Sequence, residues 1–316
     1  MARRQPRVVA VGDAIVDLVT PPLPPIPHAD FQGHVRALDA MPGGNATNFA
    51  LAIASLGAGT AFVGAIGADP NGEILRKAYR HHGVRAVLRI DPRLPTGATM
   101  ALTWAAGGRA LITALGANAS LRLRDVPAGL FRGADHLHRS GFWWTESLIG
   151  KPTSLLLGRA RRSGLATSLD VSTDPRGWPE ERLEAVRTCL RNVTTFFGNE
   201  AEVCAVAGRT DPLEAAAHLC SRGPQEVVVH QADRGATAVT RSDRVSAAAF
   251  PVPIDNPTGC GDVFNAAYVF ARAYKSGIPE ALRFANAAAA LHLEDRRHPY
   301  PSAPAVRRRV RTFAGR

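Results

Sequence analysis

The chain has 316 residues, of which 46% are hydrophobic and 21% charged, and its formal net charge is +11. A chain of this length can bury a large core, and the short apolar run near its start carries Asp13 and Asp17, which fits neither a signal peptide nor a membrane span. The four cysteines form no CxxC pair, which argues against a structural zinc site and a disulfide framework. We therefore expect a cytoplasmic protein with reduced thiols.

Positive charge is spread along the chain and is densest near its ends, in residues 2–7 and 306–311. The sequence shows no helix-turn-helix, zinc-finger or aromatic-interleaved basic motif, which are the usual signs of nucleic-acid binding. We expect no nucleic-acid partner and no membrane attachment, whereas a basic field favours a small anionic ligand.

Apolar, β-rich segments alternate along the chain with segments of helical character. The strand-like segments are residues 7–12, 60–67, 165–171, 194–199 and 226–230. This alternation is typical of a mostly parallel sheet with helices on both faces, so the sequence predicts one α/β domain over residues 1–316.

Two helices are well delimited by their end residues. Asp69-Pro70 supplies an N-cap and a first-turn proline for a helix that ends at Gly83. Asp211-Pro212 opens another helix, which closes near Gly223.

One segment departs from the alternation, from about Thr96 to Asn118. Two strand-like runs, residues 97–104 and 109–115, flank the turn at residues 105–108 and predict a β-hairpin. Together with the proline-rich region after Asp17, this hairpin is expected to form a small sheet that projects over the site. The alternative is an antiparallel edge of the main sheet.

Residues 256–262 read Asn-Pro-Thr-Gly-Cys-Gly-Asp and are followed at once by an amphipathic stretch. Two glycines around a small residue let backbone N–H groups converge, and a helix expected to begin at Asp262 adds the positive end of its dipole. The motif therefore predicts an anion site at Gly259, Cys260 and Gly261, with Asp262 as a base for a substrate hydroxyl. This combination indicates phosphoryl transfer, although the motif alone also fits a structural loop with a capping aspartate.

A second glycine motif, from Gly43 to Gly57, also lies at a helix start. The two motifs together resemble the two signatures of the ribokinase-like, or phosphofructokinase-B, carbohydrate kinases, whose second signature commonly reads D-x-T-G-A-G-D. Further stretches follow in the family's order, at residues 11–17, 63–73, 116–118, 199–202 and 284–291. The resemblance covers nearly the whole chain. It implies a ribokinase-like three-layer α/β/α fold with a β lid from about residues 17–41 and 96–118.

The resemblance implies an acceptor site and a nucleotide site. For the acceptor, Gly43 and Gly44 would let the chain pass close to a polyol, Asn48 would bond hydroxyls, and Asp17 would accept hydrogen bonds from them. Each of these residue types is also common in a purely structural role. The residues implied for the nucleotide and its magnesium are Asn199, Glu202, His230, Gly235, Thr258 and Asn286.

Magnesium keeps much of its hydration, so Glu202 would act on it through water. The alternative for Asn199 and Glu202 is a helix cap with an ordinary surface acid. Trp143 and Trp144 could contact a ligand, but paired tryptophans after a strand are more often core residues.

Besides Cys260, which stands where the family usually has alanine, four positions depart from the family's pattern. Ala232 replaces a glycine of the nucleotide loop, and Asn256 replaces the first acid of the second signature. Arg297 replaces a glycine in a C-terminal loop that, with the second signature, holds a monovalent cation in relatives. The last two changes predict weak or no dependence on potassium. Ile15 replaces an asparagine of ribokinase, which disfavours D-ribose.

The sequence thus predicts an ATP- and Mg²⁺-dependent kinase for a small sugar or sugar derivative. A nucleoside kinase on the same scaffold remains open, with Trp104, Trp143 and Trp144 as candidates for stacking on a base. A non-catalytic sugar-binding protein is a third possibility, against which the retained Gly259, Gly261 and Asp262 argue. A lid sheet has edges that can pair with a second copy, so a homodimer through the lid is plausible. Cys260 need supply only its backbone N–H, and its thiol is not assigned a catalytic role.

Overall fold

The computed structural model describes residues 4–25, 30, 32–105, 109–254 and 258–313. Its strands are β1 Arg7–Val11, β2 Ile15–Val19, β3 Asp39–Gly43, β4 Gly59–Gly67, β5 Arg85–Asp91, β6 Gly97–Thr103, β7 Arg109–Ala114, β8 His136–Arg139, β9 Ala166–Asp170, β10 Thr195–Asn199, β11 Glu226–His230, β12 Ala236–Thr240 and β13 Arg244–Ala247. Its α-helices are α1 Asn45–Ser55, α2 Pro70–His81, α3 Lys151–Arg162, α4 Glu180–Arg187, α5 Glu200–Ala207, α6 Pro212–Arg222, α7 Cys260–Ala273, α8 Ile278–Glu294 and α9 Ala303–Phe313. Short 3-10 turns at Gly116–Ser120, Leu123–Asp125, Ala128–Phe131, Glu146–Leu148, Leu190–Asn192 and Ala232–Arg234 complete the described elements.

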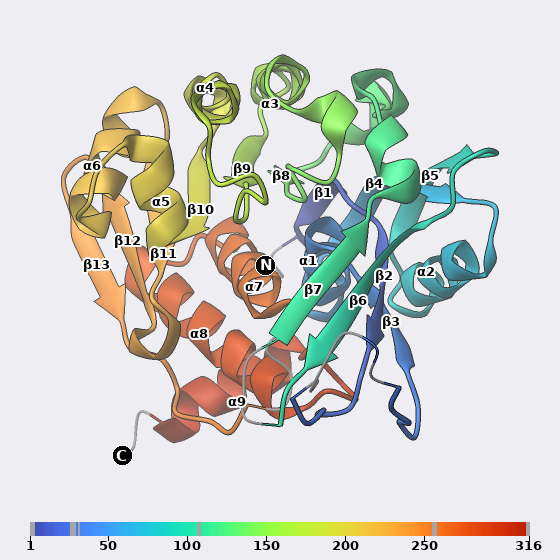
Figure 1. The fold of residues 1–316 in the computed structure, drawn as a ribbon. Helices are drawn as coiled ribbons and strands as arrows, with labels where there is room; N and C mark the ends of the chain where they lie inside the picture. Colours follow the sequence, from blue (N-terminus) through green and yellow to red (C-terminus); the bar gives the residue numbers. More distant parts are fainter. Residues whose placement is uncertain (1–3, 26–29, 31, 106–108, 255–257, 314–316) are drawn as a thin grey trace.

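A nine-stranded sheet, called the large sheet below, runs through the body of the molecule in the order β13-β12-β11-β10-β9-β8-β1-β4-β5 (Figure 1). The pairs from β11 to β5 are parallel, and β12 is antiparallel to both of its neighbours. The predicted mostly parallel α/β sheet is therefore confirmed. The chain winds outward from β1 through β4 to β5 and then returns to β8, so the strand order reverses between β1 and β8. Such a switch point leaves a crevice at the carboxyl ends of the strands.

Helices cover both faces of the large sheet, and the alternation of side chains along each strand divides the core in two. In β1, Val8 and Ala10 pack with the layer that contains α1, α7 and α8, whereas Val9 and Val11 pack with the opposite layer, which contains α3, α5 and α6. Burial of successive residues on both faces explains why the sequence shows a continuous apolar run there.

A second sheet of four strands, called the small sheet, has the order β3-β2-β6-β7. The predicted hairpin is present as β6 and β7, and the partners of β6 are β2 and β7. The alternative, an antiparallel edge of the main sheet, is therefore wrong. Asn118 anchors the return to the body, since its side-chain amide bonds both the N–H and the C=O of Ala14.

The predicted helix caps are present, with one correction. The Asp69 side chain accepts a hydrogen bond from Gly72 N, and the Asp211 side chain accepts from Leu213 N and Glu214 N. The helix after the second glycine motif begins at Cys260 and not at Asp262, because Gly259 already acts as its N-cap. Asp262 still lies in the first turn of α7. None of the helices in the described part of the chain combines the length and apolar composition of a transmembrane segment.

Candidate active site

A cavity of about 400 Å³ lies between the small sheet and the carboxyl ends of the large sheet's strands. Asp170, Asn199 and His230 are the last residues of β9, β10 and β11, and all three line it. This is the crevice expected beside the switch point of the strand order. The predicted site residues that line the cavity are Asp17, Gly44, Asn48, Asn199, Glu202, His230, Thr258, Gly259, Cys260, Gly261 and Asp262.

The first turn of α7 enters the cavity through a glycine with a left-handed backbone. Gly259 has φ 83°, and a Cβ built on it would lie 2.8 Å from Nδ2 of Asn48. Both facts require glycine here. The first N–H groups of a helix have no partner within the helix, so the start of α7 presents them at the cavity wall together with the positive end of its dipole.

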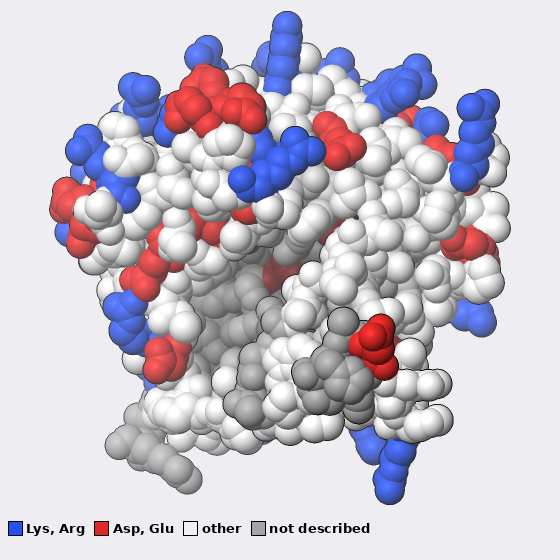
Figure 2. All heavy atoms as spheres, viewed as in Figure 1, with Lys and Arg blue, Asp and Glu red and all other residues white. Residues whose placement is uncertain are grey.

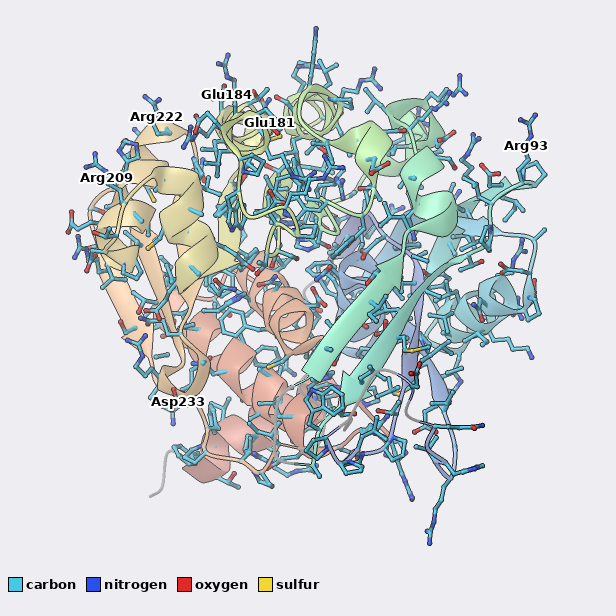
Figure 3. All side chains as sticks on the ribbon, viewed as in Figure 1. Arg93, Glu181, Glu184, Arg209, Arg222 and Asp233 are labelled. Carbon is cyan, nitrogen blue, oxygen red and sulfur yellow. The ribbon has the colours of Figure 1, made fainter. Side chains whose placement is uncertain are left out.

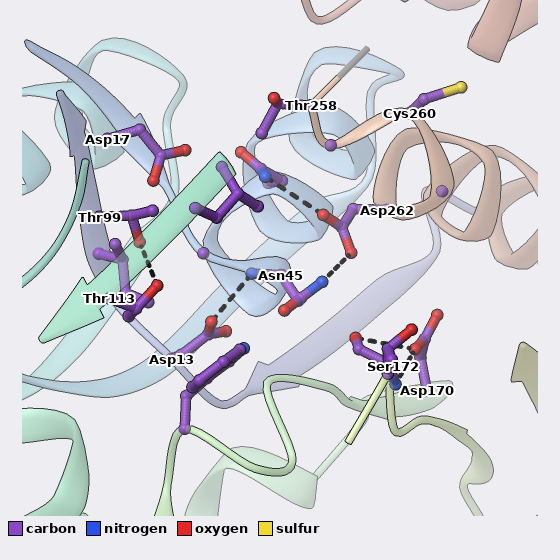
Figure 4. Close-up of a pocket in the computed structure, with 18 of the residues that line it drawn as sticks. Asp13, Asp17, Asn45, Thr99, Thr113, Asp170, Ser172, Thr258, Cys260 and Asp262 are labelled. Atoms are coloured by element: carbon purple, nitrogen blue, oxygen red, sulfur yellow. Dashed lines mark hydrogen bonds between the residues drawn. The ribbon is translucent and has the colours of Figure 1, made fainter. Parts of the chain in front are cut away.

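Asp262 is 4% exposed, and each of its carboxylate oxygens accepts a hydrogen bond from an asparagine amide (Figure 4). Nδ2 of Asn45 lies 3.2 Å from Oδ1, and Nδ2 of Asn48 lies 3.2 Å from Oδ2. Burial raises the pKa of Asp262 well above its ordinary value, the negative charge of Asp170 adds to the rise, and the two amides oppose it.

Sequence reasoning missed Asn45, although it follows the first glycine pair directly. It also missed Tyr300, whose hydroxyl donates to Oδ1 of Asn48 at 2.9 Å. The carboxylate of Asp262 is thus held by α1 and, through Asn48, by the C-terminal loop. A contact between residues 252 positions apart leaves no local sequence signal.

Asp13, also missed, fixes the start of α1. Its carboxylate accepts hydrogen bonds from Ala46 N at 2.8 Å and Asn45 N at 3.1 Å. Burial raises the pKa of Asp13, while these backbone donors and the nearby Arg139 guanidinium oppose the rise. Asp13 directly follows β1 and Gly12, a position at the switch point that could have singled it out.

At the opposite wall, Asp17, Thr99 and Thr113 lie side by side on β2, β6 and β7. Thr99 is the register partner of both Asp17 and Thr113. A Cβ on Gly43 would lie 2.2 Å from Oδ2 of Asp17, so Gly43 makes room for this carboxylate and is not itself part of the lining.

The part of the cavity next to the carboxyl ends of β9 and β10 contains acidic side chains at the end of a strand and the start of a helix. Asn199 and Glu202 form a capping box: Glu202 Oε2 accepts from Asn199 N, and Asn199 Oδ1 accepts from Glu202 N. Glu202 is buried, so the surface-acid alternative is wrong, but the capping alternative describes its hydrogen bonds with Asn199, while Oε1 accepts from Thr173 Oγ1 at 2.8 Å. Burial raises the pKa of Glu202, and the negative charge of Asp170 raises it further.

His230 is joined to Asp170 through Asn265. His230 Nε2 lies 3.0 Å from Asn265 Oδ1, and Asn265 Nδ2 donates to Asp170 Oδ2 at 2.7 Å. Burial lowers the pKa of His230 and favours a neutral ring. A neutral ring that donates from Nε2 leaves Nδ1 as an acceptor on the side of Gly261.

Two predicted nucleotide residues do not line this cavity. Asn286 donates to the carbonyl oxygens of Ala247 and Ala248. Gly235 has φ 96°, and a Cβ on it would lie 2.1 Å from the Ala247 oxygen. Both residues therefore fix the chain just after β13.

The tryptophan pair divides between core and cavity. Trp143 is buried, donates from Nε1 to Ser172 O, and carries the Arg182 guanidinium 4.2 Å above its ring. Trp144 lines the cavity. The Cys260 sulfur points away from the Asp262 carboxylate (Figure 4). The four cysteines, all within the described residues, form no disulfide.

Residues 5–302 match the model of a protein family described as pfkB family carbohydrate kinase. The chain belongs to this family. A fructokinase from Klebsiella pneumoniae is 26% identical over 280 residues, which is 87% of each chain. An aminoimidazole riboside kinase from Salmonella typhimurium is 25% identical over 270 residues, or 84% of this chain and 80% of the relative. A protein of E. coli described as a ribokinase II, solved with ATP and Mg²⁺, superposes with a TM-score of 0.84 at 20% identity and covers 98% of this chain and all of its own.

Membership of the pfkB family makes the chain an ATP-dependent phosphotransferase with a ribokinase-like fold. Some of the positions that depart from the family's pattern lie within the described residues. Asn256 lies outside the described residues, whereas Ile15 lines the cavity. The C-terminal loop is tied to the second signature by His292, whose Nε2 lies 2.7 Å from Thr258 O and whose Nδ1 lies 2.6 Å from Pro299 O.

Proposed function

We propose that this kinase transfers the γ-phosphate of ATP to a hydroxyl of a small sugar or sugar derivative, with Asp262 as the general base. The observation that carries the proposal is the juxtaposition of a buried carboxylate and the start of α7 in one cavity. The N–H groups of Gly259, Cys260 and Gly261 stabilise the charge on the transferred phosphoryl group. Asp262 takes the proton of the attacking hydroxyl.

Magnesium fits the acidic end of the cavity. Asp170 and Glu202 are buried near one another, and each carboxylate has a raised pKa whose main cause is burial. A bound divalent cation would stabilise the ionised form of both carboxylates and so lower their pKa values. Within the described residues no three His, Cys, Asp or Glu side chains form a metal cluster. We therefore propose that Glu202 acts on Mg²⁺ through water, as suits an ion that retains much of its hydration and binds substrate phosphates.

The small sheet supports a role as a lid over the acceptor, since Asp17, Thr99 and Thr113 reach the cavity from it. Its edge strand β7 and the exposed Met100 and Ile112 support a homodimer through this sheet. Light scattering of the purified protein tests the dimer. Reduced cysteines support a cytoplasmic location.

The exposed arginines argue against a nucleic-acid site. Arg93, Arg209 and Arg222 point outward at the periphery of the molecule, away from the cavity (Figure 3). On the face that Figure 2 shows, the basic side chains stand apart from one another, whereas a nucleic-acid backbone is bound by a continuous basic stripe.

The decisive experiment is ADP production with Mg-ATP and a panel of sugars, sugar derivatives and nucleosides, run beside Asp262→Ala. We expect turnover with one acceptor group and a loss of about a hundred- to ten-thousandfold in kcat for Asp262→Ala, with both substrate affinities within a few-fold. Retained turnover in Asp262→Ala would remove it as the base. Exclusive turnover of a nucleoside would support the nucleoside kinase, for which Trp144 is the available stacking residue. ATP binding without turnover would support a non-catalytic protein.

A further inference from the structure

The acceptor wall of the cavity is a row of three oxygen-bearing side chains on neighbouring strands. Asp17 on β2 pairs in register with Thr99 on β6, which pairs with Thr113 on β7. Side chains of register partners project from the same face of a sheet, and all three line the cavity (Figure 4). They face the wall that carries Asp262 and Asn45.

The hydrogen-bonding capacity of this row suits hydroxyl groups. Thr99 Oγ1 and Thr113 Oγ1 lie 3.0 Å apart, so one O–H is used between them and one remains as a donor, together with the hydroxyl lone pairs. An ionised Asp17 can only accept. The row therefore has more acceptors than donors and matches a ligand that can donate, as each sugar hydroxyl can. Phosphate and carboxylate groups can only accept.

The charges around the cavity also favour an uncharged ligand. The lining includes the carboxylates Asp13, Asp17, Asp170, Glu202 and Asp262, and no lysine or arginine among the described residues. Figure 2 shows that the charged atoms visible within the hollow of this face are acidic, whereas the blue side chains project around its periphery.

The buried Arg139 bonds to other groups. The guanidinium of Arg139 donates to the hydroxyls of Thr153 and Thr145 and to the carbonyl of Ser140. It is fully buried and does not line the cavity. Among the described residues the lining has no lysine or arginine, so an anionic acceptor would meet a wall rich in carboxylates, and like charges in a desolvated site repel strongly.

We infer that the acceptor is an uncharged polyol whose hydroxyls are bound by Asp17 and the Thr99–Thr113 pair, and that sugar phosphates and sugar acids are excluded by charge. This inference rests on the proposed kinase function. ATP brings the negatively charged phosphoryl group to the other end of the cavity, where the N–H groups at the start of α7 bind it. The acceptor end needs no anion site of its own.

Matched pairs of acceptors test the inference. ADP production is measured with neutral sugars and polyols and with the phosphate monoester and aldonic acid of the same carbon skeletons. In each pair with turnover, kcat/KM of the anionic member should be lower by at least about tenfold. A higher kcat/KM for an anionic member, abolished by Asp262→Ala, would overturn the inference and leave the kinase intact. If no acceptor in the panel is phosphorylated, the proposed function is overturned, and this inference with it.

Isosteric variants test the hydroxyl pair. Thr99→Val and Thr113→Val should each raise KM for the preferred neutral acceptor by about tenfold with a smaller change in kcat, because one hydrogen bond to the ligand is lost. The double variant should raise KM by less than the product of the two single-variant factors, because the two hydroxyls are bonded to each other. The matched control is Thr103→Val, on the same strand and bonded to Thr20 away from the cavity, which should leave KM unchanged. Equal KM values in all three single variants would overturn the assignment.

Discussion

The two ends of the cavity are built in different ways. At the phosphate end, a glycine with a left-handed backbone and the first turn of α7 present backbone N–H groups beside Asp262, all within residues 259–262. At the acceptor end, Asp17, Thr99 and Thr113 come from three strands and meet only because the small sheet pairs them. The groups at the first end lie within one short segment, whereas the groups at the second end are brought together by the pairing of distant strands. In the proposed function, the groups that bind the phosphoryl charge are thus set within one segment, whereas the contacts to the acceptor depend on the fold.

The strongest test of the phosphate end separates two neighbouring glycines. Gly259→Ala should lower kcat by about a hundredfold and also destabilise the protein, because a Cβ at φ 83° is strained and would lie 2.8 Å from Asn48. Gly261→Ala should lower kcat by a similar factor without loss of stability, because its Cβ would lie 3.8 Å from the nearest atom of His230 but would stand at the phosphate site. Thermal melts and steady-state kinetics distinguish the two. Full activity in Gly261→Ala would remove the start of α7 as the anion site.

A smaller effect is expected on the pH dependence of kcat/KM. The raised pKa of Asp262 means that the base is protonated, and activity lost, as pH falls through that raised value. Asn45→Ala removes a hydrogen bond that lowers this pKa, so its acid limb should move to higher pH, with a loss of about fivefold on that limb.

Asp170→Asn removes a charge that raises the same pKa, so its acid limb should move to lower pH. The asparagine can still accept from Asn265, which makes it a conservative change. A pH-rate profile of each variant is the measurement. Shifts in the same direction would contradict the assignment of the acid limb to Asp262.

The smallest effect is expected from potassium. His292 links Thr258 and Pro299 by side-chain hydrogen bonds, and Arg296 of the C-terminal loop pairs with Asp39 of β3 at 3.3 Å. Because His292 already joins the loop at Thr258 to the C-terminal loop, exchanging sodium for potassium should change kcat by less than about twofold. A several-fold rise with potassium in an otherwise identical assay would contradict this expectation.

Five strands of the large sheet, β1, β4, β9, β10 and β11, and the caps at Asp69 and Asp211 could be predicted because propensity, periodicity and capping residues act within a few positions, whereas β5, β8, β12 and β13 were not predicted. The hairpin could be predicted for the same reason, and a small sheet shared with the region after Asp17 was expected, but the register that pairs Asp17 with Thr99 could not be predicted. Asp262 was singled out from its motif. Asn45, Tyr300 and the Thr99–Thr113 pair were not, because they matter only through distant contacts. Asn286 and Gly235 were placed by resemblance, and their contacts in the structure are with residues 247–249.

The bond from Tyr300 to Asn48 also sets an order in which the site can be assembled. Synthesis proceeds from the N-terminus, and domains begin to fold as they emerge. All strands of both sheets and all of α7 precede Tyr300 in the chain. A nascent chain could thus hold every glycine motif in place and still lack the last support of Asp262. The hydrogen bond that holds Asn48, and through it the Asp262 carboxylate, can then form only after the C-terminal loop has been synthesised.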